Sequence, residues 1–273
     1  MSAMDDVNVL ITLPYPEPLL GRLQAVSPKL QFHVLPTRKA KDLPEELLPQ
    51  IEVLYTIDTL PAPESIPNLA WIQFHYAGID SVLNNPLLRS KVKVTTMSGA
   101  ATSQVAEFAM MSILALARRV PLMMSDKAGK MWAEDRLRRF QPLDLRGSTV
   151  GIVGYGSIGR EIARLCHAFG ATILAAKRDL KHLEDNGYLP EGLGDPRSDL
   201  VERMYPPQAL KTMAPECDFL VVSVPLTRDT RGLVGEKVLG ALKPTAFLID
   251  VSRGGVVDHG ALITALNLPL IHI

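Results

Sequence analysis

Short apolar runs alternate with amphipathic segments along the first third of this chain. Strands are predicted where apolar or alternating residues cluster between Pro- and Gly-containing turns. The expected strands cover residues 7–13, 31–35, 53–57, 70–74 and 92–95, and a helix is expected over residues 18–25. This alternation is typical of a small α/β unit with a mostly parallel sheet.

A long helical pattern follows and leads into a second α/β unit. The pattern covers residues 103–119, is interrupted by Pro121, and resumes to about Arg139. Further strands are expected at 149–154, 171–176, 218–223 and 245–251, with helices at 157–169 and 259–266. The units should use right-handed crossovers, and the boundary between them should lie near residues 98–102.

Three glycines stand where the first strand of the second unit meets its helix. Gly154 suits a tight turn, Gly156 lets a diphosphate approach the backbone, and Gly159 lets the helix pack closely on the strand. The free N–H groups of the first helical turn, at Ser157 and Ile158, would hold the phosphates. Glycines at this spacing are weak signals alone, but a strand before and a helix after predict a dinucleotide site.

The end of the next strand bears on the choice of dinucleotide. An NAD site usually places an acidic residue there for the ribose hydroxyl, whereas this chain has Lys177 and Arg178. Two cations would attract a 2′-phosphate, so we expect NADP rather than NAD. The alternative is a solvated charge pair with NAD held by other contacts, in which Asp179 serves the ribose.

Residues 179–207 form a stretch rich in Gly, Pro and charge that is too long for an ordinary connection. We interpret it as a surface excursion near the adenine end of the cofactor. A disordered insert without function is the alternative at this point.

Composition narrows the classes of partner. The chain has 29 basic residues (Lys and Arg) and 29 acidic residues (Asp and Glu), so its formal net charge is zero. This balance disfavours binding to nucleic acid or to an anionic membrane. The longest apolar stretch, residues 108–117, is too short to span a bilayer, and no signal peptide opens the chain. Cys166 and Cys217 lack metal-ligand or redox spacing, so we expect buried thiols, no metal site and a cytoplasmic location.

Five segments together resemble the D-isomer-specific 2-hydroxyacid dehydrogenases, the family of phosphoglycerate dehydrogenase and the glyoxylate/hydroxypyruvate reductases. The likeness runs from about residue 50 to residue 266, and the segments occur in the family's order. They are residues 75–80, 103–107, 151–160, 224–233 and 250–258. The resemblance implies an NAD(P)-dependent oxidoreductase that transfers hydride between nicotinamide and the CH–OH or keto carbon of a 2-hydroxy or 2-keto acid.

The resemblance also implies a fold of two doubly wound domains. A flavodoxin-like substrate domain would cover residues 1–99, and a Rossmann dinucleotide-binding domain, incomplete at its C-terminal end, residues 100–273. It implies a homodimer through residues 103–140, although the apolar helix there also fits a core helix between the domains. It does not name the acid that is the substrate.

Site residues follow from the resemblance and from chemistry. Backbone amides of Ala77 and Gly78 would hold the substrate carboxylate. Arg253 follows an apolar strand, and its guanidinium can clamp a carboxylate and stabilise charge that grows on the keto oxygen, so it is the expected catalytic residue. The residues expected to line the cofactor wall are Val224, Pro225, Thr230, Val251 and Ser252, together with Arg253.

In the family, the acid/base pair is a histidine assisted by a glutamate, and both follow the helix that ends here near Leu266. No residue of this sequence matches either of them. His272 comes too soon in the chain and lacks the partner that such a role needs. His75 adjoins the carboxylate loop and could face the cleft, and the alternative is a polar residue in a turn. We therefore expect a truncated form with impaired reduction, and the alternative function is a non-catalytic NAD(P)-binding or sensing module.

Overall fold

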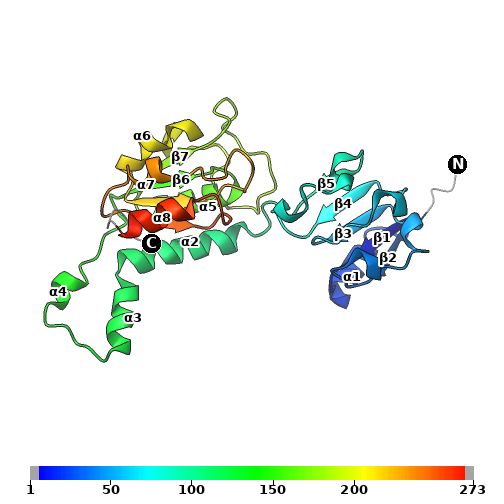
Figure 1. Cartoon of the computed structure of the whole chain (residues 1–273), viewed down its shortest axis with the longest axis horizontal. Coiled ribbons are helices and arrows are strands. Elements are labelled where there is room, and N and C mark those ends of the chain that lie inside the picture. Colours follow the sequence, from blue (N-terminus) through cyan, green and yellow to red (C-terminus); the bar gives the residue numbers. More distant parts are fainter. Residues whose placement is uncertain (1–5, 268–273) are drawn as a thin grey trace. The chain divides into compact units, whose positions relative to one another are not determined.

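The computed structural model describes residues 6–267, and the chain divides after Ser98 into two compact units (Figure 1). His272 and the apolar tail from Leu268 lie outside the described residues. Each unit is built on its own five-stranded parallel sheet.

The first unit has the strand order β2-β1-β3-β4-β5, which is the flavodoxin-like doubly wound order. Side chains alternate between the sheet faces, so Leu10 and Leu54 enter one core while Val9 and Ile11 enter the other, beside α1. The elements are β1 Val7–Ile11, α1 Glu17–Gln24, β2 Leu30–Val34, η1 Ala40–Asp42, η2 Leu48–Gln50, β3 Val53–Thr56, η3 Pro63–Ser65, β4 Trp71–Phe74, η4 Asp80–Val82, η5 Pro86–Arg89 and β5 Lys93–Thr95, where η marks a 3₁₀ turn.

The second unit has the strand order β10-β9-β6-β7-β8. Counted within the unit, this is the order 5-4-1-2-3 of a Rossmann sheet, whose direction of winding reverses between β6 and β9. The elements are α2 Thr102–Ala117, α3 Val120–Ala128, α4 Arg136–Arg139, β6 Thr149–Val153, α5 Ser157–Ala168, β7 Thr172–Ala176, β8 Val201–Tyr205, η6 Pro207–Ala209, α6 Leu210–Met213, η7 Ala214–Glu216, β9 Phe219–Val222, α7 Glu236–Leu239, β10 Phe247–Asp250 and α8 His259–Asn267. Both sheets confirm the predicted fold class.

Helices cover both faces of the second sheet. On one face, Ala106 and Ile113 of α2 pack with Ile162 and Cys166 of α5 against the strands, and small residues on α2 allow the close approach. The other face is covered by apolar residues of α6, α7 and α8, among them Met213, which is fully buried. The three layers place the carboxyl ends of the strands at one edge, where α/β proteins bind ligands.

The helix resumes at the predicted break, but the prediction that it continues to about Arg139 is wrong. Helix α2 ends at Ala117, Arg119 adopts a left-handed φ of 57°, and α3 starts with Pro121 in its first turn. Helix α3 then ends at Ala128, followed by Gly129 and by Lys130 at φ 51°, so only the single turn of α4 follows. A left-handed residue stops an α-helix because the next N–H no longer meets its acceptor.

The description of residues 179–207 as one surface excursion is also wrong at its C-terminal part. Strand β8 lies inside it and pairs in parallel with β7 from Ile173↔Val201 to Ala176↔Tyr205. The two exposed residues in the middle of β8, Glu202 and Arg203, hid this edge strand from the apolar pattern. The disordered alternative therefore fails for this part of the segment.

Candidate functional site

The glycine turn between β6 and α5 is shaped by contacts that leave no room for side chains. Gly154 has a φ of +105°, and a Cβ there would lie 2.6 Å from Cγ1 of Val224 and 3.0 Å from its amide nitrogen. Ser223 Oγ also donates to the Gly154 carbonyl at 2.9 Å. Glycine thus lets the ends of β6 and β9 meet at the point where the sheet changes direction.

The next two glycines differ in a way that suits a diphosphate. A Cβ on Gly159 would lie 2.1 Å from the Gly154 oxygen, so this glycine is needed for helix–strand packing. A Cβ on Gly156 would meet nothing within 4 Å, and no side chain caps the helix. Within residues 6–267, the amides of Ser157, Ile158 and Gly159 donate to no acceptor, so they remain available to an anion. The residues present therefore fit a dinucleotide diphosphate.

The ends of β9 and β10 complete this edge. Val224 and Pro225 follow β9, and Val251 follows β10 with its amide bonded to the Val222 carbonyl at 3.0 Å. Thr230 Oγ1 donates to the Pro225 carbonyl at 2.6 Å and accepts from the Thr227 amide at 2.7 Å, which closes the loop after β9. Thr230 thus shapes the wall through hydrogen bonds within that loop.

The loop that carries Arg253 is fixed by Asp250. The Asp250 carboxylate accepts from the Ser252 amide at 2.9 Å and from the Ser252 hydroxyl at 2.5 Å. Arg253 is exposed, and its Nη1 donates to the Ser252 carbonyl at 3.0 Å. The structure therefore brings Gly154, Val224 and Ser252 to neighbouring strand ends, and Arg253 follows directly.

The two predicted phosphate cations differ in their surroundings. The Lys177 ammonium donates to backbone carbonyls of the segment after β7, whereas Arg178 is exposed and has no hydrogen bond or ion pair to any residue between 6 and 267. Burial, with a smaller contribution from Arg160, lowers the pKa of Lys177 below its ordinary value. Asp179, the alternative ribose ligand, bonds through Oδ2 to His182 Nδ1 at 2.8 Å.

In the first unit, Ala77 and Gly78 follow the end of β4, with Ala77 exposed and Gly78 half-buried. His75, just before them, lies with its Nδ1 2.6 Å from the Tyr55 hydroxyl, and burial raises the pKa of that tyrosine. The Tyr55 contact fixes the imidazole at the start of the loop.

A comparison with protein families identifies this arrangement. Residues 110–272 match the family model described as "D-isomer specific 2-hydroxyacid dehydrogenase, NAD binding domain". The chain belongs to the D-isomer specific 2-hydroxyacid dehydrogenase family. Membership confirms the predicted family and the predicted class of NAD(P)-dependent oxidoreductase.

Several relatives of this dehydrogenase resemble it over most of its length. A glyoxylate reductase of Thermococcus gammatolerans is 30% identical over 275 residues, covering 95% of this chain and 75% of the relative. A hydroxypyruvate reductase of Thermotoga maritima is 31% identical over 245 residues, covering 88% and 72%. The solved NADPH-dependent glyoxylate/hydroxypyruvate reductase of Sinorhizobium meliloti, in complex with NADP and malonate, is 28% identical with a TM-score of 0.70, covering 98% and 77%.

Residue Arg160 of this dehydrogenase is a feature that the sequence reasoning missed. Its side chain is fully buried behind the glycine turn, with its guanidinium carbon 4.7 Å from the centre of the Tyr155 ring. The Tyr155 hydroxyl donates to Asp195 at 2.6 Å, and burial followed by this hydrogen bond raises the pKa of the tyrosine. The sequence signal for this buried charge was an Arg-Glu pair directly after the third glycine. At this point the helix packs closely on the strand, so a charged side chain there needs a buried partner.

Two kinds of feature are absent from residues 6–267 of this dehydrogenase. No cluster of three or more His, Cys, Asp or Glu side chains is placed to hold a metal ion. No single described helix has the length and apolar character to cross a membrane, and α2 with α3 meets those criteria only as a pair bent by 66°.

Proposed function

We propose that this chain binds a nicotinamide dinucleotide along the carboxyl edge of the second sheet and supports hydride transfer to the keto carbon of a 2-keto acid. The proposal rests on the contrast between two glycines. Packed protein atoms leave no room for a side chain at Gly159, whereas Gly156 faces open space beside backbone amides that have no acceptor among the described residues. The cofactor, when bound, would supply the hydride.

The chain's own residues would bind and polarise the substrate. The backbone N–H groups of Ala77 and Gly78 are proposed to donate hydrogen bonds to the substrate carboxylate. Arg253 is proposed to pair with the acid and to stabilise the charge that develops on the keto oxygen, since a fixed cation lowers the free energy of that charge. Ser252 and Asp250 would position Arg253 through the hydrogen bonds that fix its loop.

We further propose that residues 1–99 are the substrate domain and residues 100–273 the dinucleotide domain, in a cytoplasmic protein. NADP is the proposed cofactor, since a basic side chain replaces the usual carboxylate after β7, and the substrate is proposed to be glyoxylate or hydroxypyruvate. The names of the relatives support this class of substrate.

The test is to follow NADPH absorbance with glyoxylate and with hydroxypyruvate. Turnover should fall by about 100-fold or more in Arg253→Ala, because a bidentate cation is lost from the developing charge. Arg253→Lys keeps the charge but loses the planar fork, so it should recover only part of the rate. Dinucleotide binding without turnover would instead support the alternative, a non-catalytic NAD(P)-binding module, and unchanged turnover in Arg253→Ala would refute the role of this residue.

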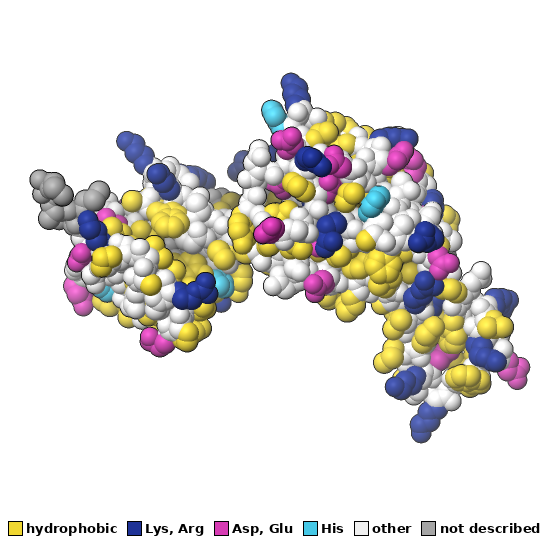
Figure 2. All heavy atoms as spheres, turned by 180° about the vertical axis from the view of Figure 1, so that it is seen from behind, with side chains coloured by type: hydrophobic (Ala, Val, Ile, Leu, Met, Phe, Trp, Pro, Cys, Tyr) yellow, Lys and Arg dark blue, Asp and Glu magenta, His cyan; other side chains and the backbone are white. Residues whose placement is uncertain are grey.

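A second copy of the chain is the proposed partner of the α2–α4 region. Helix α3 buries only Asp126 and α4 buries no residue, and both project from the second unit with hydrophobic side chains on their surface (Figures 1 and 2). The Asp126 carboxylate joins the two helices through a bidentate pair with Arg139 at 2.7 and 2.8 Å. The exposed large apolar residues here are Phe108, Met111, Val120, Met123, Met124, Met131, Trp132 and Leu137. Such a patch favours a homodimer through residues 103–140.

A further inference from the structure

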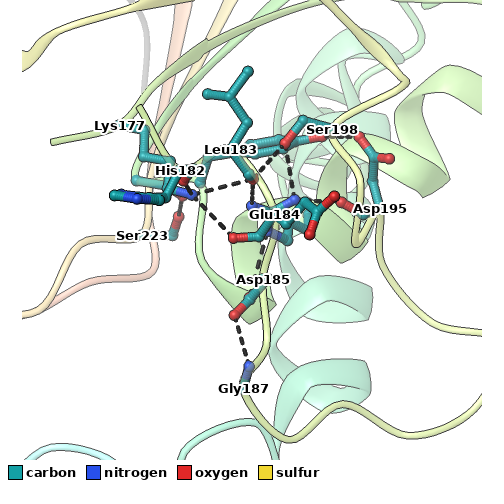
Figure 3. A network of polar contacts seen from close by, with 12 residues as sticks. Lys177, His182, Leu183, Glu184, Asp185, Gly187, Asp195, Ser198 and Ser223 are labelled. Atoms are coloured by element: carbon teal, nitrogen blue, oxygen red, sulfur yellow. Dashed lines mark hydrogen bonds and ion pairs between the residues drawn. The ribbon is translucent and has the colours of Figure 1, made fainter. Parts of the chain in front are cut away.

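The segment between β7 and β8 is held in place by a lysine ammonium that donates to its backbone. Lys177 Nζ lies 2.5 Å from the His182 carbonyl, 3.1 Å from that of Leu183 and 3.5 Å from that of Glu184 (Figure 3). An ammonium has three donors, and these contacts use them. A lysine in this arrangement holds three consecutive backbone carbonyls of the loop around its ammonium group.

Arg160 holds the same segment through a second set of contacts. Its Nη2 donates to the Leu183 carbonyl at 2.5 Å, and its Nη1 donates to the Asp195 carbonyl and to Ser198 Oγ, the latter at 3.0 Å. Its Nε lies 3.4 Å from an Asp185 carboxylate oxygen. The side chain is fully buried, so these contacts replace water around the charge.

The Leu183 carbonyl is the point where these contacts converge. It accepts from Lys177, from Arg160 and from Ser198 Oγ, the last at 2.9 Å (Figure 3). If the Lys177 ammonium moved to a phosphate, the His182 carbonyl would lose its hydrogen-bond partner and the segment would lose one of its two cationic anchors.

Of the two cations that directly follow β7, Lys177 and Arg178, only Arg178 is left available to a ligand. Asp179 uses Oδ1 to accept the Lys181 amide at 2.9 Å and Oδ2 to contact His182. Its carboxylate is therefore committed to its own turn. Arg178 lies between these two committed residues and is exposed, without a polar partner among the described residues.

We infer that Lys177 is a positioning residue, which together with Arg160 fixes residues 179–200 as a wall of the adenosine subsite, and that Arg178 alone reads the 2′-phosphate. This inference rests on the proposed function, and it divides between two adjacent cations the tasks that the sequence pattern assigned to both. Lys177 would affect NAD and NADP alike, through the shape of the wall. Arg178 would distinguish them, through a charge-assisted hydrogen bond to a group that NAD lacks.

The test combines dissociation constants with hydrogen exchange of the full chain. NADP and NAD are titrated by calorimetry against Lys177→Met, Arg178→Gln and the control Lys181→Met, which removes an exposed lysine of the same segment. Arg178→Gln should weaken NADP by about 10- to 100-fold, the range of a charge-assisted pair, with NAD binding and exchange unchanged. Lys177→Met should weaken both dinucleotides by similar factors and speed exchange over residues 182–200. Lys181→Met should change neither.

Lys177→Arg provides the rescue, because a guanidinium can still donate to the carbonyls, and it should restore slow exchange. The inference is overturned if Lys177→Met weakens NADP at least 10-fold more than NAD while exchange stays slow, or if Arg178→Gln leaves the ratio of the two constants unchanged. If the unaltered chain bound neither dinucleotide, the proposed function and the role of Arg178 would both fail. The exchange data would then still decide whether Lys177 anchors the segment.

Discussion

Alanine at two positions of the glycine turn separates packing from ligand binding. Position 159 has no space, since a Cβ would lie 2.1 Å from the Gly154 oxygen and ordinary contact begins at 3.4 Å. In Gly159→Ala, α5 must therefore move by more than an ångström away from β6. Overpacking of this kind costs about 1–3 kcal/mol. For a unit of this size we expect the Tm to fall by on the order of 5 °C.

Position 156 has the opposite environment. A Cβ meets nothing within 4 Å, and φ is −96°, which any residue adopts. In Gly156→Ala, the loss of glycine at the helix cap destabilises the folded state, whereas the lower conformational entropy of the unfolded chain stabilises it. The two effects oppose each other, so the free energy of unfolding should change by less than about 1 kcal/mol. The new methyl group would occupy the space through which the diphosphate reaches the amides, and binding should weaken at least ~10-fold, or about 1.4 kcal/mol.

Thermal unfolding with and without NADP measures both effects. At about 100 times its Kd, a ligand stabilises the folded state by about 2.7 kcal/mol, so the unaltered chain should show a clear rise in Tm. At the same NADP concentration, Gly156→Ala should show an ordinary Tm without ligand and a rise with ligand of at most about half, since a 10-fold weaker Kd leaves about 1.4 kcal/mol of stabilisation. Gly159→Ala should show a lower Tm already without ligand. Hydrogen exchange of α5 assigns the change to the second unit. Unimpaired NADP binding by Gly156→Ala would refute the diphosphate site at the glycine turn, and an unchanged Tm in Gly159→Ala would refute the packing argument.

Two further predictions concern pH and assembly. Burial raises the pKa of Glu161, but hydrogen bonds from Arg164 and from the Gly194 amide outweigh it and lower the pKa below its ordinary value of 4.5. A lowered carboxyl pKa adds stability above about pH 4.5, and this stability is lost as the pH falls through the folded-state pKa. In denaturant titrations, Glu161→Gln should therefore lose less unfolding free energy between pH 5 and pH 3 than the unaltered chain. An equal loss in both proteins would contradict this prediction. Met124→Glu, in the exposed α2–α4 region, should shift the mass measured by light scattering from dimer to monomer, whereas the control Phe169→Glu, also an exposed apolar residue, should not. A monomeric unaltered chain would refute the dimer.

Much of the fold could be read from local patterns. Buried parallel strands are nearly continuous apolar runs, so β6, β7, β9 and β10 were predicted within one or two residues at each end. Strand β8 was missed because an edge strand needs fewer apolar residues, and Glu202 and Arg203 resemble a loop. The break at Arg119 was placed correctly at the Pro121 region, but the end of α3 was not, because Gly129 and Lys130 carry a weaker stop signal than proline.

The sequence by itself determined the local chemistry of the glycine turn. Three glycines between an apolar strand and an amphipathic helix allow few other conformations, and the structure gives Gly154 and Gly159 the backbone and packing roles that this pattern predicts. Tertiary structure alone decided how the charged residues are used. Lys177 and Arg178 are adjacent and similar in sequence, yet one is bonded to carbonyls five to seven residues away and the other is exposed. The same holds for Arg160, whose burial depends on carbonyls more than twenty residues along the chain. Apolar periodicity is a property of neighbouring positions, whereas the partner of a charge is set by whichever distant backbone the fold brings within hydrogen-bond distance.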